Sequence, residues 1–408
     1  MKIALIHTPL WGRGGAERQV LTLAIELQKL GNKVEIFTPA LNEEACYPEM
    51  IKQLTVNVLP KTEKSTEYSK VGKSPSRKSF LGQIAADQFY TSGLLPMHRL
   101  GKMIPKGFNV INNHNAPTEW AAFTAKRKLK APIVWMCNEP PAWFFPPQGR
   151  KIKKALNWPL FGLWDRISVD YIDEILVLSN AAGSLVKKAY DKPYRIIRTG
   201  LDAEKFYNVS GNEVRKKNGL EGDFVMLQVS NLSPFKRQID AITALSFLAK
   251  KYSNVKLILD GYGPAETHEE LKKLSEKLGV EDRLLIWDTK SDTELAKVYA
   301  ACDVFVFPGK ITWGLAVVEA MASGKPVVVS RGCGASEIIH DNINGMLFNH
   351  TRPEEIAQKV EILINDAALR ASIAKKGFEY VKNNLSWKNY AKNMESIFLQ
   401  SIQRHKAS

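Results

Sequence analysis

The chain alternates short apolar runs with amphipathic stretches, and it does so in two successive series. The runs of the first series are Lys2 to His7, Lys33 to Thr38, Phe108 to His114, Ala131 to Cys137 and Asp173 to Ser179. Those of the second are Asp223 to Ser230, Val255 to Gly263, Val304 to Gly309 and Lys325 to Ser330. Polar residues close each run, as in parallel strands that are buried on both faces. The alternation predicts two doubly wound α/β domains.

The two series meet at a polar, turn-rich stretch, Arg198 to Glu213. We therefore expect an N-terminal Rossmann-like domain over residues 1–200 and a second over 201–385. Ligands of such sheets lie at the carboxyl ends of the strands. A cleft between the two domains is the expected active site.

Composition excludes several classes of protein. The four cysteines are scattered, with no CxxC spacing and no histidine pairing, which argues against a disulfide framework or a zinc site. The N-terminus lacks the pattern of a signal peptide. No run of about 18 apolar residues predicts a transmembrane helix. We expect a cytoplasmic protein in a reducing compartment.

The net charge of +15 is unevenly distributed, because residues 1–200 carry an excess of 13 positive charges. Such a field attracts anions, although plain solubility explains the same charge. Aromatic and basic residues are mixed between Pro141 and Arg166, which suits either an anionic membrane surface or interdomain packing. The stretch Lys61 to Phe80 is rich in lysine and serine and is expected to be a long loop.

Glycine-rich turns follow two predicted strands. Gly14 and Gly15 open the first helix, where bare backbone and exposed N–H groups favour an anion. Gly261 and Gly263 follow the strand that begins at Val255. The first turn is not GxGxxG, so the dinucleotide fingerprint is absent.

Lys236 and Arg237 stand just before a predicted helix. Two cations at a helix N-terminus oppose the helix dipole by roughly 0.3–1 kcal/mol each. A bound diphosphate would resolve this conflict, and a solvated pair of charges is the alternative.

Glu319 is a single carboxylate within an apolar helix that begins near Gly314 and Leu315. A buried glutamate needs a polar partner. A ligand's ribose diol would supply one, as would a buried lysine or arginine. The helix start itself is a potential phosphate site.

Several segments in order resemble one family: "GGAER", "NHNAP", "SNLSPFKRQIDAITAL", "LILDGYG", "YAACDVFVFPGKITWGLAVVEAMASGKPVVVS", "CGASEII" and "NINGMLF". The chain is similar to the retaining family 4 glycosyltransferases (glycosyltransferase group 1), which have the GT-B fold. The resemblance implies two Rossmann-like domains facing across a cleft, with a C-terminal helix, residues 386–408, that returns to the N-terminal domain. It also implies transfer of a sugar from a nucleotide-diphosphate donor.

Residue by residue, the resemblance implies that Lys236 binds the diphosphate, that Glu319 holds the donor ribose, and that His114 lies near the donor sugar. These three form the implied catalytic set. Together with the turns and cations described above, the expected donor-binding set is Gly14, Gly15, Asn231, Arg237, Gly261, Gly263, Trp313, Gly314, Leu315 and Glu319. The sequence has no Asp-x-Asp motif, so we expect no metal and no cofactor besides the nucleotide-sugar co-substrate.

Two positions depart from the family pattern. Ile311 stands where the first glutamate of the family's E-x7-E motif falls, and Asn231 stands where an arginine falls. The expected function is transfer of a sugar to a glycan or lipid-linked acceptor in cell-surface polysaccharide or glycolipid synthesis, with peripheral contact to an anionic membrane. Mannose from GDP-mannose, and glucose or N-acetylglucosamine from UDP donors, are the candidate sugars.

The main alternative is a sugar-nucleotide-binding or glycan-binding protein of the same fold that does not catalyse transfer. Ile311 supports it, because the substitution removes a charge from the donor site. A nucleic-acid-binding protein would rest on charge alone and has no motif, so nucleic acid is not an expected partner. A nucleotide-sugar epimerase is a weaker alternative.

Overall fold

The computed structural model describes residues 1–60, 93–140, 158–289 and 291–407. The chain divides into two compact units, Met1–Thr199 together with Trp387–Ser408, and Gly200–Ser386. We refer to them as unit 1 and unit 2. The stretch 61–80 and most of the stretch 141–166, on which we based a loop and a membrane contact, lie outside the described residues.

Unit 1 contains a seven-stranded parallel sheet with the order β3-β2-β1-β4-β5-β6-β7. The chain runs outward from β1 in one direction and outward from β4 in the other, so the topological switch point lies between these two strands. The strands are β1 (Lys2–Ile6), β2 (Lys33–Thr38), β3 (Thr55–Val58), β4 (Val110–His114), β5 (Ile133–Met136), β6 (Glu174–Val177) and β7 (Arg195–Ile196).

The helices of unit 1 connect these strands and pack on the sheet. They are α1 (Gly15–Lys29), α2 (Pro48–Ile51), α5 (Leu94–Met103), α6 (Thr118–Leu129), α7 (Trp158–Asp170), α8 (Asn180–Tyr190) and α16 (Trp387–Ala407). Helix α1 ends as its sequence indicates, since Gly31 follows it in the left-handed region at φ 86°.

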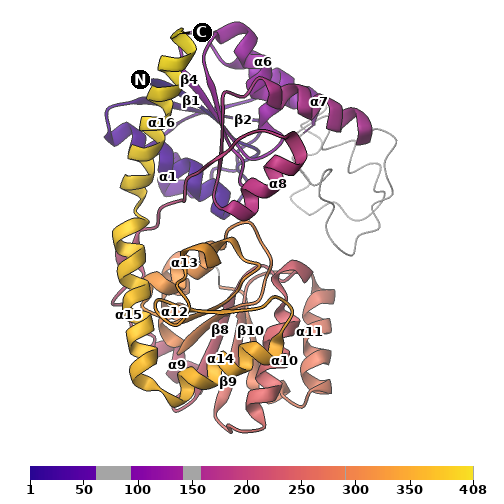
Figure 1. The fold of residues 1–408 in the computed structure, drawn as a ribbon, viewed down its shortest axis with the longest axis vertical. Coiled ribbons are helices and arrows are strands. Elements are labelled where there is room, and N and C mark those ends of the chain that lie inside the picture. The colour runs from indigo at the N-terminus through magenta and orange to yellow at the C-terminus, as the bar shows by residue number, and fades with distance from the viewer. Residues whose placement is uncertain (61–92, 141–157, 290, 408) are drawn as a thin grey trace. The chain divides into compact units, whose positions relative to one another are not determined.

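The C-terminal helix α16 lies alongside α1 (Figure 1). The Gln19 amide donates to the Tyr390 hydroxyl at 3.0 Å, and the Asn32 amide donates to Glu395 at 2.6 Å. Buried Met394 and Phe398 add apolar contact area on α16. The predicted return of the last helix to the N-terminal fold is confirmed.

Unit 2 contains a six-stranded parallel sheet with the order β10-β9-β8-β11-β12-β13. The strands are β8 (Phe224–Val229), β9 (Val255–Asp260), β10 (Leu284–Trp287), β11 (Val304–Phe307), β12 (Val327–Ser330) and β13 (Met346–Phe348). Its switch point lies between β8 and β11. The prediction of two doubly wound parallel sheets is thereby confirmed.

Helices cover this sheet, and several of them form a continuous apolar core with β8, β9, β11, β12 and β13. They are α9 (Asn212–Lys217), α10 (Gln238–Ala249), α11 (Ala265–Lys277), α12 (Asp292–Ala301), α13 (Leu315–Ala322), α14 (Pro353–Asn365) and α15 (Ala367–Asn384). Short 3-10 turns lie at η1 (Ala203–Lys205), η2 (Pro234–Lys236), η3 (Glu281–Arg283) and η4 (Gly334–Ile338).

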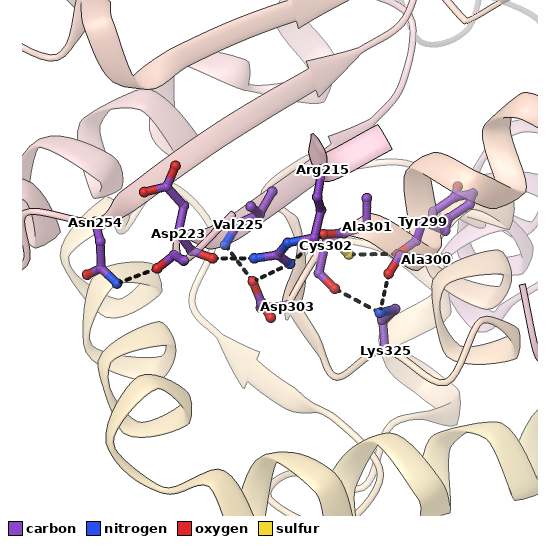
Figure 2. A network of polar contacts seen from close by, with 11 residues as sticks. Arg215, Asp223, Val225, Asn254, Tyr299, Ala300, Ala301, Cys302, Asp303 and Lys325 are labelled. Carbon is purple, nitrogen blue, oxygen red and sulfur yellow. Dashed lines mark hydrogen bonds and ion pairs between the residues drawn. The ribbon is translucent and has the colours of Figure 1, made fainter. Parts of the chain in front are cut away.

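A polar network fixes the C-terminus of α12 (Figure 2). The Lys325 ammonium donates to the carbonyls of Ala300 and Cys302, at 2.7 and 2.9 Å. Arg215 donates to the Ala301 carbonyl at 2.8 Å and pairs with Asp303 at 3.1 Å. Cations at the end of a helix satisfy its last carbonyls and its dipole. The network therefore holds α12 against the amino ends of β8 and β11.

Candidate functional site

The predicted site residues of unit 2 come from the segments that follow β8, β9 and β11. Because these strands are parallel, their carboxyl ends meet at one edge of the sheet. Asn231 follows β8, Gly261 and Gly263 follow β9, and the loop to Gly314 follows β11. The fold thus gathers most of the implied donor-binding set at this edge.

Gly261 and Gly263 allow two of these loops to touch. A Cβ atom at Gly261 would lie 2.0 Å from the Ser230 carbonyl oxygen, and one at Gly263 would lie 2.5 Å from Leu232 Cβ. Tyr262 between them is 62% exposed, and its hydroxyl accepts a hydrogen bond from the Asn231 amide at 3.0 Å. The glycines therefore have a packing reason, and Tyr262 is a potential ligand contact that the sequence analysis missed.

Lys236 ends the turn η2, next to the loop that follows β11. Its carbonyl accepts from the Gln228 amide at 2.8 Å, and its ammonium lies 5.7 Å from the centre of the Phe307 ring. Burial raises the pKa of the Cys333 thiol to about 12, and the Lys236 charge opposes that rise. Lys236 is thus close enough to Cys333 to affect its ionisation.

Arg237 differs from the expectation. Its guanidinium forms two hydrogen bonds with the Asp240 carboxylate, at 2.5 and 2.7 Å. Asp240 belongs to the first turn of α10, where an acid is favourable. The conflict with the helix dipole that we inferred for Arg237 is therefore already resolved inside the protein. The predicted contact of Arg237 with a donor stays a prediction.

Gly314 forms the N-cap of α13 in a backbone conformation, φ 129° and ψ 66°, that strongly favours glycine. A Cβ atom at this position would lie 2.7 Å from the Cys333 sulfur. Leu315 begins the helix. The turn of Lys236 packs against the same loop, because the Lys310 N–H donates to the Phe235 carbonyl at 3.2 Å, so a cation and a helix N-terminus belong to neighbouring segments of the sheet edge. Both groups favour an anion there.

Trp313 takes part through its backbone. Its carbonyl accepts from the Cys333 thiol at 2.8 Å and from the Ala335 N–H at 3.0 Å. The side chain is 5% exposed, and its indole N–H is buried with no hydrogen-bond partner in the described part of the chain. Trp313 therefore shapes the loop in front of α13.

Glu319 is 5% exposed and accepts a hydrogen bond from the Tyr299 hydroxyl at 2.9 Å. Tyr299 belongs to α12 and is fully buried. Burial, and then the Glu319 charge, raise the pKa of Tyr299 well above its usual range, so the phenol stays protonated and donates. The neutral hydroxyl of Tyr299 is thus one polar partner of Glu319, as the sequence predicts that Glu319 must have.

Ile311 lies on the same loop, four residues from the start of α13. Its carbonyl accepts from the Gly334 N–H at 2.9 Å, and its backbone forms a parallel bridge with Cys333. The backbone at this position is therefore held in place, and the side chain it presents is apolar.

In unit 1, His114 ends β4 and has no exposed surface. Its Nε2 lies 2.8 Å from the Asn112 amide oxygen, and its Nδ1 is buried without a partner among the described residues. Burial, and then the nearby His7, hold the pKa of His114 well below its usual range. The ring is therefore neutral, and its predicted place near the donor sugar stays a prediction.

His7, which the sequence analysis missed, follows β1 on the other side of the switch point. Its ring centre lies 6.4 Å from that of His114, and burial lowers its pKa to about 4. Its Nε2 lies 3.3 Å from the Asn115 amide nitrogen, and the Asn138 amide bridges Asn115 and Gln19. A polar network therefore runs along this edge of unit 1 into α1.

Gly14 forms the N-cap of α1, and Gly15 begins the helix. A Cβ atom at Gly14 would lie 2.2 Å from a carboxylate oxygen of Glu17. The Gly14 carbonyl accepts from the Tyr47 hydroxyl at 3.2 Å. Packing against Glu17 thus explains why residue 14 is a glycine. The predicted contact of Gly14 and Gly15 with a phosphate stays a prediction.

Two further searches concern metals and membranes. Within residues 1–60, 93–140, 158–289 and 291–407, no three or more histidine, cysteine, aspartate or glutamate side chains are grouped as a metal site would require. No helix in these ranges has the length and apolar character needed to cross a bilayer.

Two family profiles together match most of the chain. The profile described as Glycosyltransferase Family 4 matches residues 13–205, and that described as Glycosyl transferases group 1 matches residues 211–380. The boundary between them falls in the turn-rich stretch that joins the two series of strands.

Full-length relatives agree with these matches. The D-inositol 3-phosphate glycosyltransferase of Corynebacterium glutamicum is 24% identical over 95% of this chain and 92% of its own length. Anabaena Alr3699/HepE, solved in complex with UDP-glucose, superposes with a TM-score of 0.72 at 20% identity, covering 98% of this chain and 100% of that one.

WaaG, a glycosyltransferase involved in lipopolysaccharide biosynthesis, superposes with a TM-score of 0.69 at 17% identity, covering 97% and 99% of the two chains. At such identities the solved structures establish the fold. Together with the family profiles and the two doubly wound sheets, they lead to one assignment. The chain belongs to glycosyltransferase family 4 (glycosyltransferase group 1) and is a GT-B enzyme that transfers a sugar from a nucleotide sugar.

Proposed function

We propose that this enzyme transfers a hexosyl group, with retention, from a nucleotide-diphosphate sugar to a glycan or lipid-linked acceptor in the synthesis of a cell-surface polysaccharide or glycolipid. The observation that carries the proposal is that the turn of Lys236 packs against the loop that leads from β11 to the N-terminus of α13. The Lys310 N–H donates to the Phe235 carbonyl at 3.2 Å, and a Cβ atom at Gly309 would lie 3.2 Å from Lys236 Cα. A diphosphate is the anion that such a pair suits. UDP is the first nucleotide to test, because the similar Alr3699/HepE was solved with UDP-glucose.

During transfer, the bond between the anomeric carbon and the phosphate oxygen breaks, and a bond to the acceptor oxygen forms as the acceptor hydroxyl loses its proton. Negative charge then grows on the leaving diphosphate. Lys236 and the backbone N–H groups at Gly314 and Leu315 would stabilise that charge, an effect often worth several kcal/mol. Glu319, one turn further along α13, would accept hydrogen bonds from the ribose hydroxyls.

The alternative function is binding of a sugar nucleotide or a glycan without transfer. Ile311 is the observation that favours it, because an apolar side chain cannot accept hydrogen bonds from sugar hydroxyls. Incubation with donor and a panel of glycan and lipid-linked acceptors separates the two functions. Nucleotide binding with no turnover of any donor would favour the alternative.

Thermal unfolding with UDP, GDP and their sugars tests the donor site. A ligand at 100 times its Kd stabilises a protein by about 2.7 kcal/mol. We expect stabilisation by one nucleotide series, and we expect Lys236→Met to remove it. The control is Lys250→Met, since Lys250 is an exposed lysine at the other end of α10. If neither nucleotide stabilises the enzyme, or if both variants behave alike, the site assignment is wrong.

We also propose that unit 1 contacts an anionic membrane at the inner face of the cell, where a lipid-linked acceptor would be found. Beside the positive charge of residues 1–200, helix α7 supports this proposal. Leu163 and Ile167 on this helix, and Tyr171 just after its end, recur every four residues and are 57%, 38% and 48% exposed. Apolar side chains next to cations suit the interface of a bilayer.

Sedimentation with vesicles tests this contact. We expect binding to phosphatidylglycerol vesicles that falls with salt, and weaker binding by the double variant Leu163→Ser, Ile167→Ser. Leu399→Ser is the matched control, because Leu399 is a similarly exposed leucine on α16. If the enzyme does not bind anionic vesicles even at low salt, the membrane proposal is wrong. The assignment of the donor site does not depend on this result.

A further inference from the structure

Lys310 and His350 flank a bare stretch of backbone at the carboxyl edge of the unit 2 sheet. Lys310 follows β11, Gly332 follows β12, and His350 follows β13. A Cβ atom at Gly332 would lie 3.3 Å from Lys310 Cγ and 3.4 Å from His350 Cγ. Both side chains therefore lie close to a residue that has no side chain of its own. We call Lys310, Gly332 and His350 the lateral cluster.

The positive charge of the lateral cluster is that of Lys310. Lys310 is exposed and forms no ion pair with any residue that the structure describes. Arg237, which also acts on His350, is paired with Asp240. An ammonium with no counter-ion at the end of a parallel sheet suits an anionic ligand.

The lateral cluster adjoins the diphosphate site. The Lys310 N–H donates to the Phe235 carbonyl at 3.2 Å, and a Cβ atom at Gly309 would lie 3.2 Å from Lys236 Cα. The loop of Lys310 is thus packed against the turn of Lys236. A donor whose diphosphate is bound by Lys236 would have an adjoining part within reach of Lys310.

Tyr262 offers a place for the nucleobase, which is the end of the donor opposite the sugar. Tyr262 lies over the β8–β9 side of the sheet edge, and the lateral cluster lies over the β11–β13 side. An exposed aromatic ring suits stacking by a nucleobase. With the base at Tyr262 and the diphosphate at Lys236, the sugar is the part that faces Lys310.

We propose that the donor sugar carries a carboxylate, as a hexuronic acid does, and that the Lys310 ammonium binds it. This inference rests on the proposed function and names the substrate class of the same site. Ile311 fits it, because an apolar side chain beside Lys310 does not repel a carboxylate as a glutamate would. The loop after β11 thus presents a cation and an apolar side chain next to each other, and neither of them repels a carboxylate.

His350 adds to the positive field and responds to pH. Its Nδ1 lies 3.2 Å from the hydroxyl of the buried Ser330. The groups that face it are Arg237, Lys310 and Asp240, together with a hydrogen bond to the Pro308 backbone. Burial first, and then Arg237, lower the pKa of His350, so the free enzyme holds a neutral ring at neutral pH. A bound carboxylate favours the protonated ring. Its affinity should therefore rise as pH falls.

Isothermal titration with matched ligands tests the inference. The ligands are UDP, UDP-glucose and UDP-glucuronic acid, which differ only in the presence of the sugar and in the group at carbon 6. If the first screen selects GDP, the set is GDP, GDP-mannose and GDP-mannuronic acid. We expect the uronic acid donor to bind about tenfold more tightly than the neutral one, since hydrogen bonds between charged groups are the stronger ones.

Lys310→Met should abolish this preference and leave the affinity for the nucleotide alone unchanged, whereas Lys310→Arg should retain it. Equal affinities for the two sugars in the wild type, or a preference that survives in Lys310→Met, would overturn the inference while the nucleotide still binds. A wild type that binds none of the three ligands would overturn the proposed function and this inference with it.

The role of His350 has a separate readout. Between pH 8 and pH 6, the preference of the wild type for the uronic acid donor should grow as pH falls. In His350→Gln it should stay constant, because glutamine cannot take up a proton. A pH dependence that is the same in both proteins would remove His350 from the site.

Discussion

At the residue scale, the sequence predicts a polar partner for Glu319 but does not identify it as Tyr299. A carboxylate inside an apolar helix requires a polar partner. Nothing in the local pattern identifies Tyr299, because it lies on α12, 20 residues away. The hydrogen bond exists only after α12 and α13 pack on the same sheet. The local sequence thus shows that Glu319 needs a polar partner, but only the tertiary structure shows that this partner is Tyr299.

Glu319→Gln should separate ligand binding from stability. The amide oxygen can still accept from Tyr299, so the free energy of unfolding should change by no more than about 1 kcal/mol. The charge that would bind ribose is lost, and nucleotide affinity should fall about tenfold, since hydrogen bonds to charged groups are worth about 1.5–3 kcal/mol. Urea denaturation and isothermal titration measure the two quantities.

Tyr299→Phe is the matched control for that variant. It removes a buried donor from Glu319 and should lower stability by about 1–3 kcal/mol, because a buried acceptor loses a hydrogen bond. Nucleotide affinity should fall less than in Glu319→Gln. The opposite order of the two affinities would show that Glu319 is structural and that the ribose contact does not exist.

For Arg237, the prediction from the helix dipole did not take the nearby Asp240 into account. Its position before α10 indicates an unfavourable charge, yet Asp240 stands only three residues later in the sequence. Spacing of this kind is visible in the chain and predicts an ion pair. His7 is different, because its proximity to His114 arises from the pairing of β1 with β4. No local signal marks it.

At the scale of elements, the nine strands that the apolar runs predict are all present, and those missed are β3, β7, β10 and β13. Each of these four is the edge strand of its sheet. An edge strand pairs on one side only and is less enclosed, so its sequence need not be a continuous apolar run. The pattern therefore identifies the centre of each sheet, and the edges follow from the topology.

The two ends of α13 allow a test of why Gly314 is glycine. Gly314→Ala should cost about 1–3 kcal/mol of stability, because the new Cβ meets Cys333 and the backbone at φ 129° disfavours alanine. Nucleotide binding should weaken as well, since the loop in front of the helix must move. Chemical denaturation and isothermal titration measure the two effects.

Gly324→Ala is its counterpart at the C-terminal end of the same helix. The residue has φ 66°, and its Cβ would meet only Tyr207, at an ordinary contact distance of 3.4 Å. Stability should fall by about 1 kcal/mol with binding unchanged. Equal losses of binding in both variants would mean that α13 responds as a whole, and that its N-terminus has no particular role in holding the ligand.

At the scale of the whole molecule, composition and fold account for different properties. The alternation of strands and helices predicts the architecture, and the charge of residues 1–200 predicts anionic partners. Neither reveals which charged groups the folded chain encloses. Glu119, at the start of α6, and Asp165, on α7, are both fully buried. Two acids that are 46 positions apart in the sequence, 165 − 119, are thus both enclosed in unit 1.

These two acids have different environments. Asp165 accepts hydrogen bonds from the Trp120 indole at 3.0 Å and from the Tyr190 hydroxyl at 2.6 Å, which favour its ionised form. Burial, and then the Asp165 charge, raise the pKa of Glu119 well above its usual range. Glu119 is therefore protonated in the folded enzyme at neutral pH and ionised in the unfolded chain.

The sign of the resulting pH dependence follows from proton counts. Above the ordinary glutamate pKa of 4.5, the folded state holds a proton that the unfolded state has lost, so stability falls as pH rises towards the folded pKa of Glu119. The slope is at most about 1.4 kcal/mol per pH unit. His7 acts in the opposite sense, since its pKa of about 4 makes stability fall as pH drops below 6.5.

Glu119→Gln should therefore flatten the neutral and alkaline part of the stability curve and leave the acid part, which His7 and His114 dominate, unchanged. The gain in stability over the wild type should increase steadily from pH 5 to pH 8, because glutamine keeps the buried amide neutral without a proton. Urea denaturation at fixed pH values measures it, with Glu44→Gln, an exposed glutamate of the same unit, as the control. Parallel curves for wild type and Glu119→Gln would mean that the Glu119 carboxyl is ionised in the folded enzyme. Asp165 would then be the acid that is protonated.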